Sequence, residues 1–283
     1  MNHPLWLALA LFVLAVPATH AQSLAPANSY IARGNQRLDR GDLKGAIADF
    51  DAAVAYAPDF ADAYLNRAIA RLSKGDLDEA IADFSKAIEL DPRSVKAYEG
   101  RANAWLGKGR IEAALAEFNS LIEINPRYAS GYVNRGAARQ MMGDFQGAIA
   151  NFDKAISLNP HLAQAYNNRG AVRMRLGDLT GAADDLDKAL AINPRFTLAY
   201  NNRGLVRFEQ GHLEAAISDF NKAIEADSRY ARAYLNRGIA LLLKGEQAEA
   251  YRDFCRCLEI DPSLKSVLEE RRKAFTEKHL AKP

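Results

Sequence analysis

A period of 34 residues runs through most of this chain of 283 residues. Seven glycines stand one period apart, at Gly41, Gly75, Gly109, Gly143, Gly177, Gly211 and Gly245. A second series shares the interval, with Pro58, Pro92, Pro126, Pro160, Pro194 and Pro262, and Ser228 in the place of one proline. A unit this short cannot enclose a core of its own. A fixed period of this size therefore predicts an array of stacked repeats, each packed on its neighbours.

Each repeat has the pattern of two helices. In the second repeat, Tyr64, Ala68 and Leu72 share one face of a helix expected over residues 63–74. Gly75 then allows the left-handed backbone that ends such a helix. Beyond it, Asp76 and Glu79 have the spacing of a capping box, which predicts the start of the second helix.

The second helix has an apolar stripe of its own, which in the second repeat comprises Ala80, Phe84, Ala87 and Ile88. The dipeptide Asp91-Pro92 ends it, because the residue before a proline is driven into an extended conformation. Repeats are expected over residues 27–60, 61–94, 95–128, 129–162, 163–196, 197–230 and 231–264. Residues 263–281 are expected to form a C-terminal capping helix that covers the last repeat and turns a polar face to solvent.

These motifs resemble the tetratricopeptide repeat (TPR) family over residues 27–264. The resemblance rests on the period, on Tyr-x3-Gly/Ala, on Ala-x3-Phe-x2-Ala and on the terminal proline. It implies an all-α fold, a right-handed superhelix (α-solenoid) of seven helix-turn-helix repeats. It also implies that the first helices line a concave groove that binds other proteins.

The chain departs from the family pattern at two positions that are usually apolar. Arginines occupy the first, at Arg33, Arg67, Arg101, Arg135, Arg169, Arg203 and Arg237, and the second, at Arg37, Arg71, Arg139, Arg173 and Arg207. One interpretation is a ribbon that binds an anionic polymer. The other is a ladder of ion pairs, because an acid recurs in the second helices at Asp49, Asp83, Glu117, Asp185, Asp219 and Asp253, with Asn151 as the exception. The ladder is favoured.

Asparagines recur on the first helices, and we expect them to face the groove. An amide offers a donor and an acceptor together, which matches the backbone of an extended peptide. The row is similar to the asparagine ladder of the O-linked N-acetylglucosamine transferase superhelix. Hydrogen bonds alone do not outweigh the ordering of a peptide, so apolar side chains are needed as well. The predicted peptide-binding residues are Asn66, Asn134, Asn167, Asn168, Asn201, Asn202, Asn236, Leu205, Phe208, Leu235 and Ile239.

Several functions lack support in the sequence. Charge is nearly balanced, at +2, so no nucleic-acid partner is expected. Catalytic and metal-site patterns are missing, so neither an enzyme, a metal site nor a cofactor is predicted. The lysines with which some TPR proteins clamp heat-shock chaperones are also missing. The prediction is a non-catalytic adaptor or scaffold that binds an extended segment of another protein.

The first 21 residues differ from the rest. Leu5 to Val16 is apolar but too short to span a bilayer, which fits a signal peptide cleaved after Ala21. We therefore expect export, to the periplasm if the source is bacterial and by secretion otherwise, and no stable membrane span in the mature chain. The alternative is that the apolar segment stays as an uncleaved anchor. Cys257 aligns with core alanines, whereas Cys255 aligns with exposed residues. A self-associating scaffold linked through Cys255 is thus an alternative, with a homo-oligomer as its product.

Overall fold

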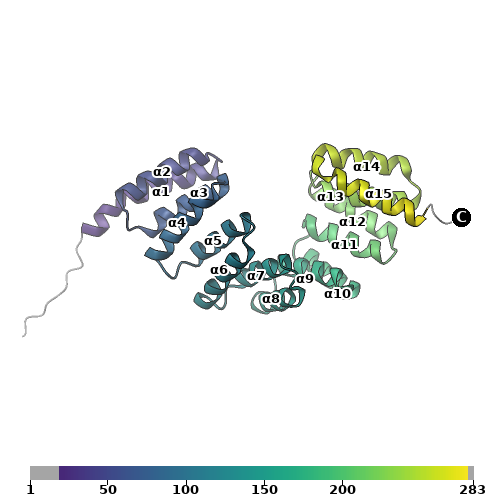
Figure 1. Ribbon diagram of the computed structural model, residues 1–283, viewed down its shortest axis with the longest axis horizontal. Coiled ribbons are helices and arrows are strands. Elements are labelled where there is room, and N and C mark those ends of the chain that lie inside the picture. Colours follow the sequence, from purple (N-terminus) through teal and green to yellow (C-terminus); the bar gives the residue numbers. More distant parts are fainter. Residues whose placement is uncertain (1–18, 280–283) are drawn as a thin grey trace, which may run out of the picture. The chain divides into compact units, whose positions relative to one another are not determined.

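A computed structural model describes the backbone of residues 19–279 and the side chains of residues 24–271 and Lys273. Every element of this described part is helical, and the helices follow one another in pairs (Figure 1). The predicted signal peptide lies almost wholly outside the described residues and stays a prediction. Within the described part, no helix is long and apolar enough to cross a membrane.

The chain divides into two compact units, with the division inside α6, between Glu117 and Phe118. The first unit holds α1 (Thr19–Asp39), α2 (Leu43–Tyr56), α3 (Ala61–Lys74), α4 (Leu77–Leu90), α5 (Val95–Gly107) and the start of α6 (Ile111–Ile124). The second holds the rest of α6, then α7 (Ala129–Met141), α8 (Phe145–Leu158), α9 (Ala163–Arg175), α10 (Leu179–Ile192), α11 (Thr197–Glu209), α12 (Leu213–Ala226), α13 (Ala231–Lys244), α14 (Gln247–Ile260), the short 3₁₀ helix η1 (Pro262–Leu264) and α15 (Lys265–His279).

The packing within each unit is that of a helical solenoid. In the second unit α7 packs on α8, α8 on α9 and so on to α14, and each first helix also touches the first helix of the next pair. The first unit repeats this order from α1 to α5. Helix pairs that pack on their neighbours within each unit, with α15 after the last pair, confirm the predicted all-α solenoid fold.

A phenylalanine in the second helix fills the space beneath a small residue in the first. Phe220 is fully buried, and a Cβ atom added to Gly204 would lie 2.5 Å from its ring. Gly136 and Phe152 have the same relationship, at 2.6 Å. The small residue of the Tyr-x3-Gly/Ala motif is therefore required by the close approach of the two helices.

The turns between paired helices agree with the sequence only in part. All seven periodic glycines have positive φ, between 70° and 92°, as predicted from their place after the first helix. The predicted capping box at Asp76 and Glu79 is wrong. Asp76 makes no side-chain cap bond and forms an ion pair with Lys74 instead. The Asp144 carboxylate does cap its helix, accepting a hydrogen bond from the backbone N–H of Gly147 at 2.9 Å.

The ends of the array cover its terminal repeats. At the C-terminal end, Leu264 and Leu268 are buried in one cluster with Leu235 and Ile239 of α13. This is the packing expected of a capping helix. At the other end, α1 begins at Thr19, ahead of the expected start of the first repeat, and Leu24 packs against the first core cluster.

Candidate functional site

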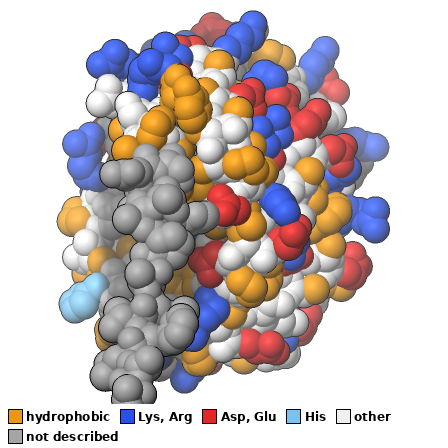
Figure 2. Space-filling view, turned by 90° about the vertical axis from the view of Figure 1, so that its left-hand side faces the viewer, with side chains coloured by type: hydrophobic (Ala, Val, Ile, Leu, Met, Phe, Trp, Pro, Cys, Tyr) orange, Lys and Arg blue, Asp and Glu red, His pale blue; other side chains and the backbone are white. Residues whose placement is uncertain are grey.

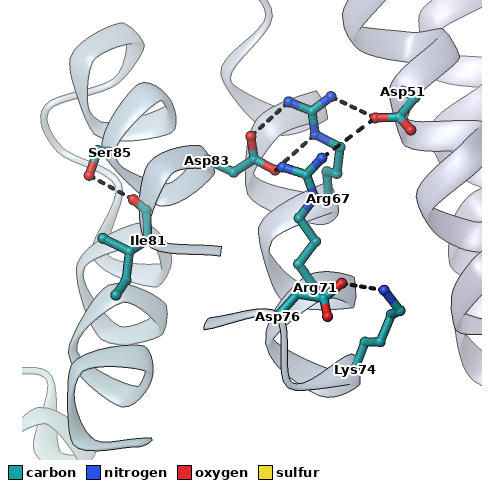
Figure 3. A network of polar contacts seen from close by, with 8 residues as sticks. All are labelled: Asp51, Arg67, Arg71, Lys74, Asp76, Ile81, Asp83 and Ser85. Atoms are coloured by element: carbon teal, nitrogen blue, oxygen red, sulfur yellow. Dashed lines mark hydrogen bonds and ion pairs between the residues drawn. The ribbon is translucent and has the colours of Figure 1, made fainter. Parts of the chain in front are cut away.

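Each first helix carries an arginine that meets a side chain sixteen residues later, in the second helix of its own pair. Arg67 donates from Nε and Nη2 to the Asp83 carboxylate at 2.8 and 2.7 Å (Figure 3). We call this series the arginine ladder: Arg33–Asp49, Arg67–Asp83, Arg101–Glu117, Arg135–Asn151, Arg169–Asp185, Arg203–Asp219 and Arg237–Asp253. Six of the seven pairs are ionic, which confirms the ion-pair interpretation.

The same arginines also bind the preceding repeat, sixteen residues earlier. Arg67 Nη1 reaches the Asp51 carboxylate at 2.7 Å (Figure 3), and Arg203 Nη1 reaches Asp187 at 2.6 Å. Each such arginine therefore ties three helices together. Sequence reasoning missed this second partner. The spacing could have found it, because Asp51 and Asp187 recur one position after the apolar residue that anchors the second helix.

A second row of arginines shares the buried acids. Arg71 and Arg207 reach Asp83 and Asp219 at 2.7 Å. The hydrogen bond to Asp185 holds the pKa of Arg169 above its ordinary value, and the bond from Arg33 lowers the pKa of the Asp49 carboxyl. These guanidinium groups are engaged within the fold, so the arginine row is a structural feature first. Acidic and basic side chains are also interspersed on the face shown in Figure 2.

Four asparagines of the second unit, Asn167, Asn201, Asn202 and Asn236, take part in a chain of hydrogen bonds. Asn202 Nδ2 donates to Asn167 Oδ1 at 2.9 Å, and Asn236 Nδ2 donates to Asn201 Oδ1 at 2.8 Å. Arg271 of α15 then donates to Asn236 Oδ1 at 2.7 Å. We call these contacts the amide chain. It joins α9 to α11, α11 to α13 and α13 to α15, so it fixes successive first helices relative to one another.

The amide chain changes what these residues offer a ligand. Asn167, Asn201 and Asn236 are only 4%, 3% and 6% exposed. Asn168 and Asn202 are half-buried, as are the two earlier asparagines, Asn66 and Asn134. The Asn66 amide donates to the backbone carbonyl of Asp62 at 2.7 Å. The structure thus brings the second-unit amides together, but it turns the most buried of them toward one another.

Some of the predicted apolar site residues are likewise covered by other parts of the fold. Leu235 and Ile239 are buried against Leu264 and Leu268, which come from the capping segment. Phe208 is partly buried and packs against the same cluster. The sequence pattern of α13 could not reveal this, because what covers a helix face depends on the next element of the stack. Leu205 remains at the surface of a hollow.

Two open hollows lie on the first-helix side of the second unit. One, of about 630 Å³, is lined by α7, α9, α11 and α15 and by the start of α10, and its lining includes Gln140, Met174, Arg175, Leu205, Glu209 and Arg271. The other, of about 490 Å³, has Gln140, Met141, Phe145, Asn168 and Arg175 in its lining. Gln140 and Arg175 line both hollows. Leu205 and Asn168 are the predicted site residues found there.

The lining combines apolar area with a few polar groups. Met141 is 58% exposed, and the Arg175 guanidinium lies over the Phe145 ring, 5.0 Å from its centre. Such surfaces suit the binding of a peptide, whose side chains need apolar contacts and whose backbone needs donors and acceptors. Among the described residues no group of three His, Cys, Asp or Glu side chains has the arrangement of a metal site.

Stacked helix pairs with small residues under buried phenylalanines define an all-α repeat protein of the solenoid class. Tetratricopeptide repeat profiles match residues 31–95 and 70–129, 141–177 and 204–245, 163–196 and 231–264. The chain belongs to the tetratricopeptide repeat family. A search of curated proteins finds no match.

Solved structures share the fold. A tetratricopeptide repeat protein from Parabacteroides merdae ATCC 43184 is 23% identical with a TM-score of 0.71, over 89% of this chain and 98% of that one. MamA is 27% identical with a TM-score of 0.51, over 61% and 94%. PilF of Pseudomonas aeruginosa is 18% identical with a TM-score of 0.65, over 76% and 96%. Proteins of this fold serve broadly as adaptors and scaffolds for other proteins.

Proposed function

We propose that this chain is a non-catalytic adaptor that binds an extended segment of another protein on the first helices of its second unit. The observation that carries the proposal is the pair of adjoining hollows lined by α7, α9 and α11. Exposed Met141, with Met174 and Leu205, supplies apolar contact there, while Gln140 and Asn168 supply polar contact.

The role proposed for the asparagines is narrower than a ladder of equal rungs. Asn168 lines a hollow, so it is the best placed to meet a peptide backbone, although its Oδ1 accepts a hydrogen bond from Asn167 Nδ2 at 3.1 Å. Asn202 is half-buried, but its Nδ2 is engaged by Asn167. Peptide contact by Asn167, Asn201 or Asn236 requires the amide chain to open first. Peptide contact by Leu235 or Ile239 requires α15 to move.

The energetics make apolar contact the main source of affinity. A hydrogen bond contributes about 0.5–1.5 kcal/mol net, and ordering one peptide residue costs about 1–2 kcal/mol. The few amides at the hollows therefore roughly cancel the ordering of the residues they bind. Burial of apolar area, at about 25 cal/mol per Å², must supply the surplus. We expect micromolar rather than nanomolar affinity.

The test uses peptides selected from a random phage-displayed library on the folded protein. The double variant Met141→Ser with Asn168→Ala is expected to bind the selected peptides about tenfold or more weakly than the unaltered protein, because it removes apolar area and a polar contact from one hollow. Met142→Ser is the matched control, since Met142 is 48% exposed but does not line either hollow. Equal affinity for all three proteins would exclude the hollows as the binding site.

Self-association is a second candidate. Cys255 is exposed, and Tyr251, one turn earlier on α14, is 65% exposed, so α14 presents a thiol beside an apolar ring. Light scattering with and without reductant tests it, since a disulfide-linked dimer would dissociate on reduction. A single monomeric mass under both conditions would rule it out.

We also propose that the protein is exported, to the periplasm if the source is bacterial. The support is the apolar run from Leu5 to Val16 and the small residues before Gln22. N-terminal sequencing of the protein isolated from its native cells tests this. A mature chain that begins at Gln22 is expected, and a chain that retains Met1 in the cytosol would contradict it.

A further inference from the structure

Repeat four departs from the arginine ladder at both of its acceptor positions. Arg135 Nε donates to Asn151 Oδ1 at 2.7 Å, and Arg135 Nη1 donates to Asn119 Oδ1 at 2.8 Å. The equivalent residues around Arg169 and Arg203 are all aspartates. Among the described residues, Arg135 is the one ladder arginine that has no carboxylate partner.

The asparagine does not replace what the aspartate provides. In repeats five to seven, the arginine Nε and Nη2 donate to the two oxygens of one carboxylate. Asn151 has a single oxygen, and its Nδ2 donates to the backbone carbonyl of Gly147 at 2.5 Å. Arg135 Nη2 therefore lacks the second carboxylate oxygen to which the arginine Nη2 donates in repeats five to seven. Two neutral amides bind this arginine but do not balance its charge.

The neighbouring arginine adds to the imbalance. Arg139 aligns with Arg173 and Arg207, which reach buried carboxylates at 2.8 and 2.7 Å. Arg139 instead reaches the Gly147 carbonyl at 3.4 Å and lies 3.8 Å from the Asp144 carboxylate, which is 53% exposed. Arg139 thus has one weak and solvated counter-charge, and Arg135 has no carboxylate partner.

The two arginines remain charged and within reach of solvent. Burial, and then the nearby Arg139, lower the pKa of Arg135, but a guanidinium stays protonated in proteins at neutral pH. Arg135 is half-buried, and the Arg139 side chain is 35% exposed. A small anion that approaches this edge would meet directed N–H donors in a partly desolvated setting, where charge-assisted bonds are strongest.

We propose that Arg135 and Arg139, with Asn119 and Asn151 beside them, form an oxyanion-binding site on repeat four. The ligand is a carboxylate or phosphate group, and it binds the guanidinium N–H groups of Arg135 and Arg139 for which the neighbouring repeats provide carboxylate oxygens. It comes either from a free inorganic anion or from an acidic side chain of a bound protein. This site is formed between α6, α7 and α8, and none of its residues lines the two hollows of the proposed peptide site.

The first test measures the affinity of inorganic phosphate for the full chain by calorimetry, at constant ionic strength set with sodium chloride. Asn151→Asp places a carboxylate of the protein in the site and is expected to weaken phosphate binding about tenfold or more, because it supplies the missing counter-charge. Asn221→Asp is the matched control. It adds the same charge beside Arg237, which already binds Asp253, and should leave the phosphate affinity unchanged.

Equal phosphate affinity in the wild type and Asn151→Asp would overturn the proposal, as would the absence of phosphate binding by the wild type. A second arm titrates an acetylated and amidated triglutamate peptide against phosphate. Competition that Asn151→Asp abolishes would support a partner's acidic side chain as the natural ligand. Phosphate binding without such competition would support a free anion.

Discussion

The arginine ladder and the amide chain both join neighbouring repeats, but they differ in chemistry and in extent. The ladder links first and second helices through buried charge, and it runs through both units. The amide chain links first helices to one another through neutral amides, from α9 to α13, and ends on Arg271 of the capping helix α15. The ladder therefore holds the two helices of a pair together and ties them to the preceding pair. The amide chain adds a second restraint, which holds the first helices of the second unit relative to one another.

The difference teaches how polar groups can replace the apolar residues usual at these positions. A buried charge is tolerated only when it is paired and hydrogen-bonded, so each ladder arginine needs a partner. A buried amide needs hydrogen bonds but no counter-charge. A substitution in the ladder should accordingly be more costly than one in the amide chain.

The largest effect is expected from removing a buried ladder carboxylate. Asp219 is fully buried and binds both Arg203 and Arg207, so Asp219→Ala should lower the free energy of unfolding by about 3–5 kcal/mol. Asp187 is the control, because it binds the same Arg203 but is 59% exposed, and Asp187→Ala should cost at most about 1 kcal/mol. Urea unfolding measures both. Similar losses would show that burial does not govern the ladder.

A smaller loss is expected in the amide chain. Asn201→Ala leaves the buried Asn236 amide without its acceptor and should cost about 1–3 kcal/mol. Asn66→Ala is the control, because Asn66 bonds only to the backbone of its own helix, and it should change stability by less than about 0.5 kcal/mol. Hydrogen exchange of α11 and α13 would locate the effect. Unchanged protection there would mean that the amide chain does not restrain these helices.

A gain is expected where the ladder is incomplete. Asn151→Asp gives Arg135 the carboxylate that the other ladder arginines have, so an acceptor with one neutral oxygen is replaced by a charged acceptor that can bind the guanidinium with two oxygens. We expect stabilisation of about 1 kcal/mol, read from thermal unfolding in the absence of added phosphate. Destabilisation would indicate that repeat four has adapted its packing to the amide.

The two networks should also respond differently to acid. The hydrogen bond from Arg33 lowers the pKa of Asp49, so its folded value lies below the value of about 4 expected in the unfolded chain. The stability it contributes is fully present above that unfolded pKa and is lost as the pH falls through the folded pKa. Asp49→Asn should therefore flatten the acid limb of the stability curve, whereas Asn201→Ala should leave its shape unchanged. An unaltered limb in Asp49→Asn would contradict this.

The sequence by itself determined the repeat, the helix pairs, the left-handed glycines and the arginine–acid pairing. These depend on intervals within one repeat or on a fixed period, and such intervals map directly onto helix geometry. The exception in repeat four could also be read from the sequence, because Asn151 stands where the other repeats have an acidic residue.

Only the tertiary structure decided what covers each first-helix face. A helical pattern places Asn236 and Leu235 on one side of α13, but it does not reveal what covers them. Asn236 is bound by Asn201 and Arg271. Leu235 is buried by Leu264 and Leu268. Those partners come from other helices, and their offset depends on how successive pairs stack. The hydrogen-bonding capacity of a side chain is local, whereas its availability is set by its neighbours in space.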